Sequence, residues 1–311
     1  MNMALGASHS PLLGITLLGD ERDALIDDAL ADARDAIAAF RPDLAVVFFP
    51  DHYNAFFYEL MPQFCIGASV SGIGDYRTHP GSFHVDTDAA IGLAGGLLES
   101  GFDVAVSYDM KADHGLAQAV ERVLGGPEGI PVLPVFINCV APPLSPCWRV
   151  SEFGRAVGRH FAGSGKRMLF VGSGGLSHDP PLPKITSADA ADRKRITERR
   201  MLLPHEREAR EIRTKDFAVR FARGETELHP LNPEWDRRFM DRIAAEDWDA
   251  IRAMRDADIT AEGGGSANEV RAWIAAFSAL GRYRVEQDLY LPVQEWIVGY
   301  GLMRAVSEST A

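Results

Sequence analysis

The feature that most constrains the fold is an alternation of short apolar runs with longer amphipathic segments in the first half of the 311-residue chain. Strands that alternate with helices are typical of a mainly parallel or mixed sheet flanked by helices, so we predict an α/β fold class. Five runs are predicted as strands: Met3 to Ser8, Leu44 to Phe49, Val104 to Tyr108, Val132 to Asn138 and Met168 to Gly172.

Helical spacing of apolar residues is clearest from Asp20 to Phe40, which has acids near its start and Pro42 just beyond its end. The sequence contains no low-complexity linker that would force a division, so we expect residues 1–311 to form a single domain. Other helices are predicted at about Asp113 to Leu124 and Val150 to Phe161, with a C-terminal helical part at Phe239 to Met254 and Ala267 to Leu280.

A charged segment at about 184–227 interrupts this pattern. It contains DRKRITERR and HEREAREIRTKD, in which basic residues are interleaved with acids. We expect a helical excursion whose charged side chains face solvent, with a lid or partner-binding element as the alternative.

Charge and cysteine content exclude several classes of protein. With 32 Lys and Arg against 44 Asp and Glu, the net charge of −12 disfavours binding to nucleic acid or anionic lipid. The three cysteines form no CxxC pair and predict neither a disulfide framework nor a thiolate zinc site. The longest apolar runs are far shorter than the ~20 residues that a spanning helix needs. We therefore expect a cytoplasmic protein with no membrane partner.

Four of the nine histidines follow predicted strands: His9, His52, His114 and His178. The carboxyl ends of strands line the ligand crevice of open α/β sheets, so these side chains are predicted to converge. A single histidine after a strand is more often a hydrogen-bonded loop or core residue. Four together indicate a metal or acid/base site, because imidazole serves both purposes near neutral pH.

The pattern does not fix the remaining metal ligand. HExxH and thiolate clusters are absent, whereas two imidazoles and one carboxylate would suit ferrous iron with open coordination positions. The flanks of the glycine run 263–265 offer two candidate carboxylates, Glu262 and Glu269.

Several of these stretches together resemble the class III extradiol ring-cleavage dioxygenases. The resemblance covers nearly the whole chain, including VLPVFIN and LHPLNPEWD. It rests on SHSPL from Ser8, PDHYN from Pro50, DHG from Asp113, GSGGLSH from Gly172, and Glu269 with Trp273.

The resemblance implies a catalytic domain that uses Fe(II), with His9, His52 and Glu269 as iron ligands and His114 and His178 as the acid/base pair. It also implies that a catechol with a propionate or acrylate side chain is cleaved with O2 to a 2-hydroxymuconic-type product. We expect a homo-oligomer that binds this small molecule.

Two residues depart from the family pattern. They are Asp179, where relatives carry Gln, and Asn268, where they carry His. Both are expected to lie behind the ligands and to affect substrate detail more than the reaction.

Two other functions fit the same histidines. One is a zinc-dependent hydrolase, which would not require oxygen, and the other is a non-catalytic binding relative on the same scaffold. The presence of both acid/base histidines argues against the second.

Overall fold

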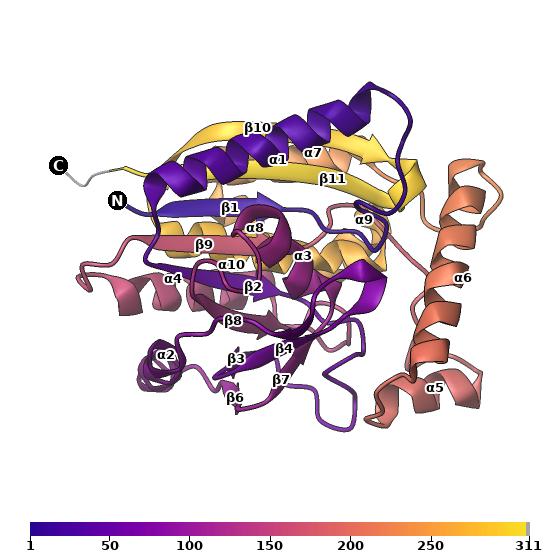
Figure 1. The fold of residues 1–311 in the computed structure, drawn as a ribbon, viewed down its shortest axis with the longest axis horizontal. Coiled ribbons are helices and arrows are strands. Elements are labelled where there is room, and N and C mark those ends of the chain that lie inside the picture. The colour runs from indigo at the N-terminus through magenta and orange to yellow at the C-terminus, as the bar shows by residue number, and fades with distance from the viewer. Residues whose placement is uncertain (309–311) are drawn as a thin grey trace.

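The computed structural model describes residues 1–308, which contain an eight-stranded mixed sheet (Figure 1). Its four central strands β1, β9, β2 and β8 are parallel, whereas β11 pairs antiparallel with β1 and β3 pairs antiparallel with β8. The strand order is β10 (Tyr283–Val293), β11 (Val298–Ser307), β1 (Met3–Ala7), β9 (Met168–Ser173), β2 (Leu44–Phe49), β8 (Val132–Ile137), β3 (Phe64–Gly67) and β6 (Ala105–Ser107).

Helices cover both faces of this sheet. In β2, Leu44, Val46 and Phe48 face one core, and the alternate residues face the other, as the two-residue period of a strand requires. One core contains α1 (Glu21–Phe40) and α3 (His114–Val123). The other contains α2 (Thr87–Glu99), α4 (Cys147–Phe161) and α10 (Val270–Leu280), with α7 (Pro233–Ala244), α8 (Trp248–Ala253) and α9 (Asp256–Gly263) beside them.

Helix α1 follows local rules closely. The Asp20 side chain accepts a hydrogen bond from the backbone N–H of Arg22, and Glu21 and Asp23 lie in the first turn. Its buried residues are Ile26, Leu30, Ala33 and Ile37.

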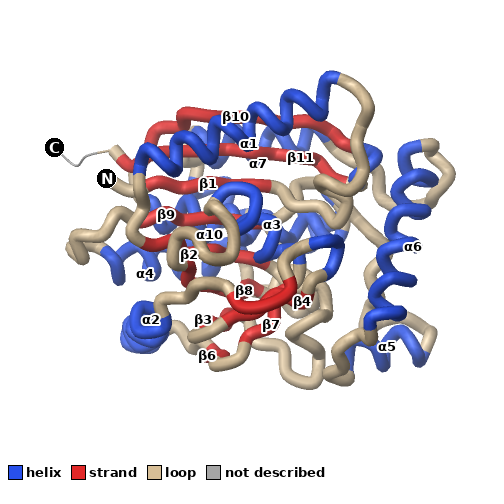
Figure 2. The backbone as a smooth tube through the Cα atoms, viewed as in Figure 1, coloured by secondary structure: helices blue, strands red, loops and turns tan. Residues whose placement is uncertain are grey.

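A small sheet and two helices lie beyond the carboxyl ends of the central strands. Within residues 1–308 the second sheet has three strands, in the order β5 (Pro80–Ser82), β4 (Val70–Ile73) and β7 (Met110–Ala112). Helices α5 (Ala190–Thr197) and α6 (Pro204–Ala222) stand apart from the sheet at this end (Figures 1 and 2). The described residues also contain three 3-10 helices: η1 (Asp75–Arg77), η2 (Gly265–Glu269) and η3 (Gln294–Trp296).

The predicted α/β class is confirmed, and β2 has the predicted bounds. The strand expected at Val104 to Tyr108 is the shorter edge strand β6, and the prediction that His114 follows it is wrong. A turn after β6 leads into β7, which belongs to the small sheet and is the strand that precedes His114. The C-terminal helices are present, but the chain continues into β10 and β11, which we did not predict.

Among residues 1–308, no helix has both the length and the apolar character that crossing a lipid bilayer would require.

Candidate active site

The structure brings together all five residues singled out in the sequence. His9 follows β1, His52 follows β2, His178 follows β9, and His114 opens α3. Glu269 is the last residue of η2, immediately before α10. Its Oε2 lies 3.4 Å from His9 Nε2, and its Oε1 lies 3.1 Å from His52 Nε2 and 3.3 Å from His178 Nε2. Glu262, the other candidate carboxylate, instead pairs with Arg238 on the surface.

The hydrogen bonds of His9 fix which ring nitrogen carries the proton. Ser173 Oγ donates to the Gly115 carbonyl at 2.6 Å and therefore accepts from His9 Nδ1–H at 3.1 Å. This leaves a lone pair on Nε2, a buried atom that has no hydrogen-bond partner within residues 1–308. Burial lowers the pKa of His9 to about 3, so this imidazole is neutral.

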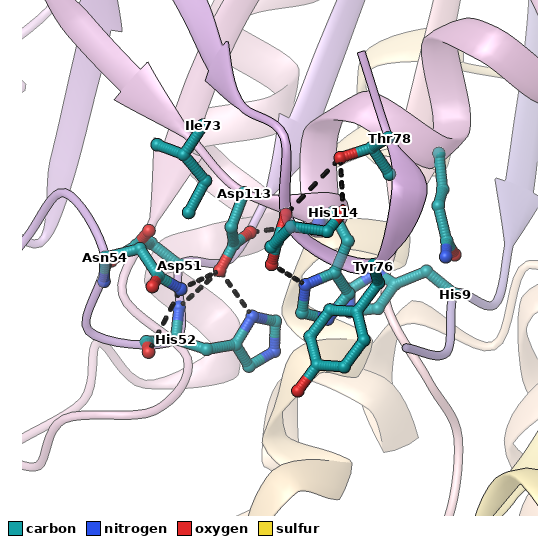
Figure 3. A network of polar contacts seen from close by, with 12 residues as sticks. His9, Asp51, His52, Asn54, Ile73, Tyr76, Thr78, Asp113 and His114 are labelled. Carbon is teal, nitrogen blue, oxygen red and sulfur yellow. Dashed lines mark hydrogen bonds and ion pairs between the residues drawn. The ribbon is translucent and has the colours of Figure 1, made fainter. Parts of the chain in front are cut away.

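His52 lies between two carboxylates, Asp113 and Glu269. Figure 3 shows its contact with Asp113. Its Nδ1 contacts Asp113 Oδ2 at 2.9 Å, while Nε2 faces Glu269. Burial alone would lower the pKa of His52, but these two carboxylates hold it well above its usual value. Asp113 also caps α3 by accepting from the N–H of Gly115, and it receives a hydrogen bond from Asn54 Nδ2 at 2.8 Å.

His114 and His178 are each oriented through Nδ1. His114 Nδ1 donates to Asp75 Oδ2 at 2.7 Å, and His178 Nδ1 donates to the Leu176 carbonyl at 2.9 Å. Both side chains line the cavity described below. Burial opposes the charged form of His178, but the neighbouring Glu269 raises its pKa above the usual value.

Glu269 is fully buried and carries the negative charge of the site. Burial would raise its pKa, but the neighbouring His178 and the hydrogen bonds from His178 and His52 outweigh burial and hold this pKa well below its ordinary range. The N–H of Gly175 donates to Oε2 at 3.0 Å. Among residues 1–308, no lysine or arginine contacts this carboxylate, which instead faces the imidazoles of His9, His52 and His178.

This donor set suits a divalent cation. Nε2 of His9 offers an unshared lone pair next to the ionised carboxylate of Glu269. The carboxylates of Asp113 and Glu269 on either side of His52 also favour a positive charge beside Glu269. The second ring nitrogen of each histidine is tied to a partner, as in most metal-ligating histidines. A second possible set consists of His9, His52 and His114, whose ligand atoms lie within 4.8 Å of one another.

A cavity of about 640 Å³ opens directly over these residues. It is lined by Leu12, Trp296 and Val298 and by residues of α5, α6 and the segment around Leu182. Residues of the segment 184–227 thus line the cavity as well as face solvent.

The two departures from the family pattern lie behind the site. Asp179 Oδ1 accepts from the N–H of Gly265 at 3.1 Å. Asn268 donates to Thr260 Oγ1 at 3.0 Å and accepts from Arg271 Nη1 at 2.6 Å. Both side chains support the loop that carries Glu269.

Sequence reasoning missed the residues that orient the histidines. Asp113 could have been identified as a helix cap, and Ser173 lies in the glycine-rich turn after a predicted strand. No sequence pattern marks Asp75, which lies in the irregular turn η1. Asn54 ends the PDHYN stretch, but nothing in that stretch indicates that its side chain contacts Asp113. Arg210 on α6, which lines the cavity, was not distinguished from the other basic residues of its segment.

Comparisons with known proteins found a matching family and several similar full-length proteins. Residues 3–300 match the family described as the catalytic LigB subunit of aromatic ring-opening dioxygenase. A 2,3-dihydroxyphenylpropionate/2,3-dihydroxicinnamic acid 1,2-dioxygenase of Rhodococcus sp is 46% identical over 311 residues, which cover 99% of both chains. A protein of the same name from Rhodococcus rhodochrous is 48% identical over 305 residues, which cover 96% of each.

A solved structure shows the same fold at low sequence identity. The crystal structure of an uncharacterized Escherichia coli K12 protein, JW3007, covers 99% of this chain and 100% of its own, with a TM-score of 0.50 and 13% identity. This likeness concerns the fold alone.

Proposed function

The chain belongs to the family of catalytic LigB subunits of aromatic ring-opening dioxygenases and is an extradiol catechol dioxygenase, and we propose that its metal is Fe(II) and its substrate a catechol with a carboxylated side chain. The substrate proposed first is 3-(2,3-dihydroxyphenyl)propionate, with 2,3-dihydroxycinnamate as the second. The names of relatives that are 46% and 48% identical over nearly the whole chain support this choice. Cleavage beside the two hydroxyls gives a 2-hydroxymuconic-type product.

The metal ligands in this proposal are His9, His52 and Glu269. The observation that carries it is the buried, unpartnered Nε2 of His9, 3.4 Å from the ionised carboxylate of Glu269. Two lone pairs that face each other in a dry site repel unless a cation lies between them. When bound, a ferrous ion supplies open coordination positions at which a catechol and dioxygen can react.

The proton-transfer groups in this proposal are His178 and His114. With Nδ1–H of His178 bound to the Leu176 carbonyl, Nε2 is the atom that accepts a phenolic proton from the catechol. His114 Nε2 returns a proton as the ring opens, and Asp75 stabilises the imidazolium through Nδ1–H. The burial of both side chains limits the access of water to these protons.

The test is an oxygen-dependent assay of protein prepared without air and loaded with Fe(II). We expect 3-(2,3-dihydroxyphenyl)propionate to be consumed with one O2 and to give a yellow ring-fission product. Activity with Zn²⁺ and no oxygen requirement would contradict the proposal.

Metal content separates ligands from acid/base residues. Replacement of His9, His52 or Glu269 by Ala should lower bound iron, whereas His114→Ala and His178→Ala should keep iron and lose about 10²- to 10⁴-fold in turnover. Loss of iron in His114→Ala, with iron retained in Glu269→Ala, would favour the three-histidine set instead.

A further inference from the structure

The cavity over the site has a basic wall on one side. Five cations from α5, α6 and the turn between them line it: Lys194, Arg195, Arg200, Arg210 and Arg213. In a chain of net charge −12, a local cluster of this kind sets the field that an anionic ligand meets.

Three of these cations already have a carboxylate neighbour. Lys194 pairs with Glu198 at 3.6 Å, Arg195 with Asp192 at 3.7 Å, and Arg200 with Glu206 at 2.8 Å. Among residues 1–308, neither Arg210 nor Arg213 has a carboxylate oxygen within 4.0 Å of its guanidinium. Arg213 is exposed, whereas Arg210 is half-buried and is therefore the more enclosed of the two.

Arg210 is held in place by neutral partners. Its Nη1 donates to Asn54 Oδ1 at 3.0 Å, and its guanidinium lies 5.9 Å from the ring centre of Tyr76. These contacts occupy few of its five N–H donors. They orient the side chain without neutralising its charge.

Arg210 is also close to the reacting groups. Asn54 donates to Asp113, which in turn contacts His52, and the Tyr76 ring lies 5.0 Å from that of His114 (Figure 3). Two residues, Asn54 and Asp113, therefore connect the guanidinium to the proposed metal ligand His52. A single residue, Tyr76, lies between it and the proposed acid/base group His114. A substituent on a catechol bound between those groups can extend toward α6.

We propose that Arg210 binds the side-chain carboxylate of the substrate and so makes α6 the element that selects carboxylated catechols. This inference rests on the proposed function. A planar guanidinium pairs with a carboxylate through two parallel hydrogen bonds, and such charge-assisted bonds are stronger than neutral ones. Among residues 1–308, no other cation that lines the cavity both hydrogen-bonds to a neutral side chain and lacks a carboxylate oxygen within 4.0 Å.

The experiment compares 3-(2,3-dihydroxyphenyl)propionate with uncharged 3-propylcatechol. Arg210→Gln should lower kcat/KM for the carboxylated substrate by about 10- to 100-fold, mainly through KM, which is the loss expected for a hydrogen bond to a charged group. For 3-propylcatechol the change should be less than about threefold, because the diol and its ligands are untouched. Arg210→Lys should recover part of the lost selectivity.

Two further variants serve as controls. Arg220→Gln removes one charge from the same helix away from the cavity and should leave both substrates unaffected. Arg213→Gln tests the other cation without a carboxylate partner, and a selective loss in that variant alone would overturn the assignment to Arg210.

The remaining outcomes are also decisive. An equal loss on both substrates in Arg210→Gln would make Arg210 a structural support of Asn54, and no loss would exclude it from binding. If the unmodified protein cleaved neither catechol, the proposed function itself would fail. If it cleaved both equally well, the proposed substrate class would fail, with ring cleavage intact.

Discussion

At the scale of single residues, the site depends on side chains that never need to touch substrate. Ser173 accepts from one histidine and donates to a backbone carbonyl, so its hydroxyl can be satisfied in only one way. Asp75 and Asp113 set the ring orientations of His114 and His52 in the same manner. The residues that bind Nδ1 of His9, His52 and His114 therefore determine where Nε2 of each ring points.

Ser173→Ala tests this dependence. Without the hydroxyl, His9 loses the partner that keeps its proton on Nδ1, and we expect Fe(II) to bind about 10- to 100-fold more weakly. Competition with a calibrated chelator measures this change. Ser278→Ala, which removes a buried hydroxyl that contacts Ser151 away from the site, is the matched control. Equal iron affinity in both variants would show that Ser173 does not orient His9.

At the scale of elements, glycines allow α10 to approach its neighbours. A Cβ on Gly154 of α4 would lie 2.2 Å from the carbonyl oxygen of Ala275, and one on Gly6 of β1 would lie 2.4 Å from the Trp273 ring. Because Glu269 immediately precedes α10, any outward shift of this helix also moves the carboxylate.

We expect Gly154→Ala to destabilise the protein by about 1–3 kcal/mol, the usual cost of overpacking a core. Urea unfolding measures this change. The control is Gly95→Ala in α2, where a Cβ meets nothing within 4 Å. That variant should gain about 0.5–1 kcal/mol, since alanine favours a helix interior. A neutral Gly154→Ala would show that the α4–α10 contact can relax.

Helix α6 is attached to η1 by a second set of contacts. Glu211 Oε1 accepts from the N–H of Tyr76 at 2.8 Å, and Thr214 Oγ1 lies 3.0 Å from the Tyr76 hydroxyl. Tyr76 has a φ of 47°, a left-handed conformation that is costly for a side chain of this size. The helix thus supports the 3-10 turn that carries Asp75.

Loss of the contact between Glu211 and Tyr76 should affect both substrate binding and the attachment of α6 to η1. We expect Glu211→Ala to raise KM severalfold and to speed limited proteolysis within residues 184–227, because α6 detaches from η1 more often. Glu208→Ala removes an exposed carboxylate from the same helix and should change neither property. Equal cleavage rates for the two variants would contradict a docking role for Glu211.

Helices and strands could be predicted from the sequence where their apolar residues form a continuous run or a regular spacing. β2 is buried on both faces and has six consecutive apolar residues, so its bounds follow from the sequence. β10 is buried only at its two ends, Tyr283 and Val293, and its exposed positions include Arg284, Glu286 and Asp288, so it has no apolar run to detect. β11 is buried yet includes two glycines and Arg304, whose charge is met by Glu286 on the neighbouring strand. Such an ion pair between neighbouring strands cannot be recognised until the pairing of the strands is known.

The site shows the same division. His9, His52 and His178 were predictable because each follows a strand of the parallel centre, where carboxyl ends share one edge. His114 reaches them from the small sheet, by a route that the sequence did not reveal. The contribution of α6 to the cavity could not be predicted either, because nothing in the local sequence distinguishes Arg210 from the arginines around it.

At the scale of the whole molecule, the proposed metal ligands come from distant parts of the chain. His9 follows the first strand, His52 the second, and Glu269 precedes the last helix. An ion held by all three therefore connects β1, β2 and α10, which belong to one sheet and the helix that packs against it. It would bind the folded chain far better than the unfolded one, where these residues are separated.

Binding of this kind must raise thermal stability. At a free Fe(II) concentration of one hundred times Kd, linkage predicts about 2.7 kcal/mol of added stability for a site absent in the unfolded state. We expect anaerobic Fe(II) to raise the Tm of the protein and a chelator to reverse the rise. His229→Ala, which changes a histidine bonded only to backbone carbonyls, should respond as the unmodified protein does. His9→Ala should show little rise, and an undiminished rise there would mean that the ion which stabilises the fold is held elsewhere.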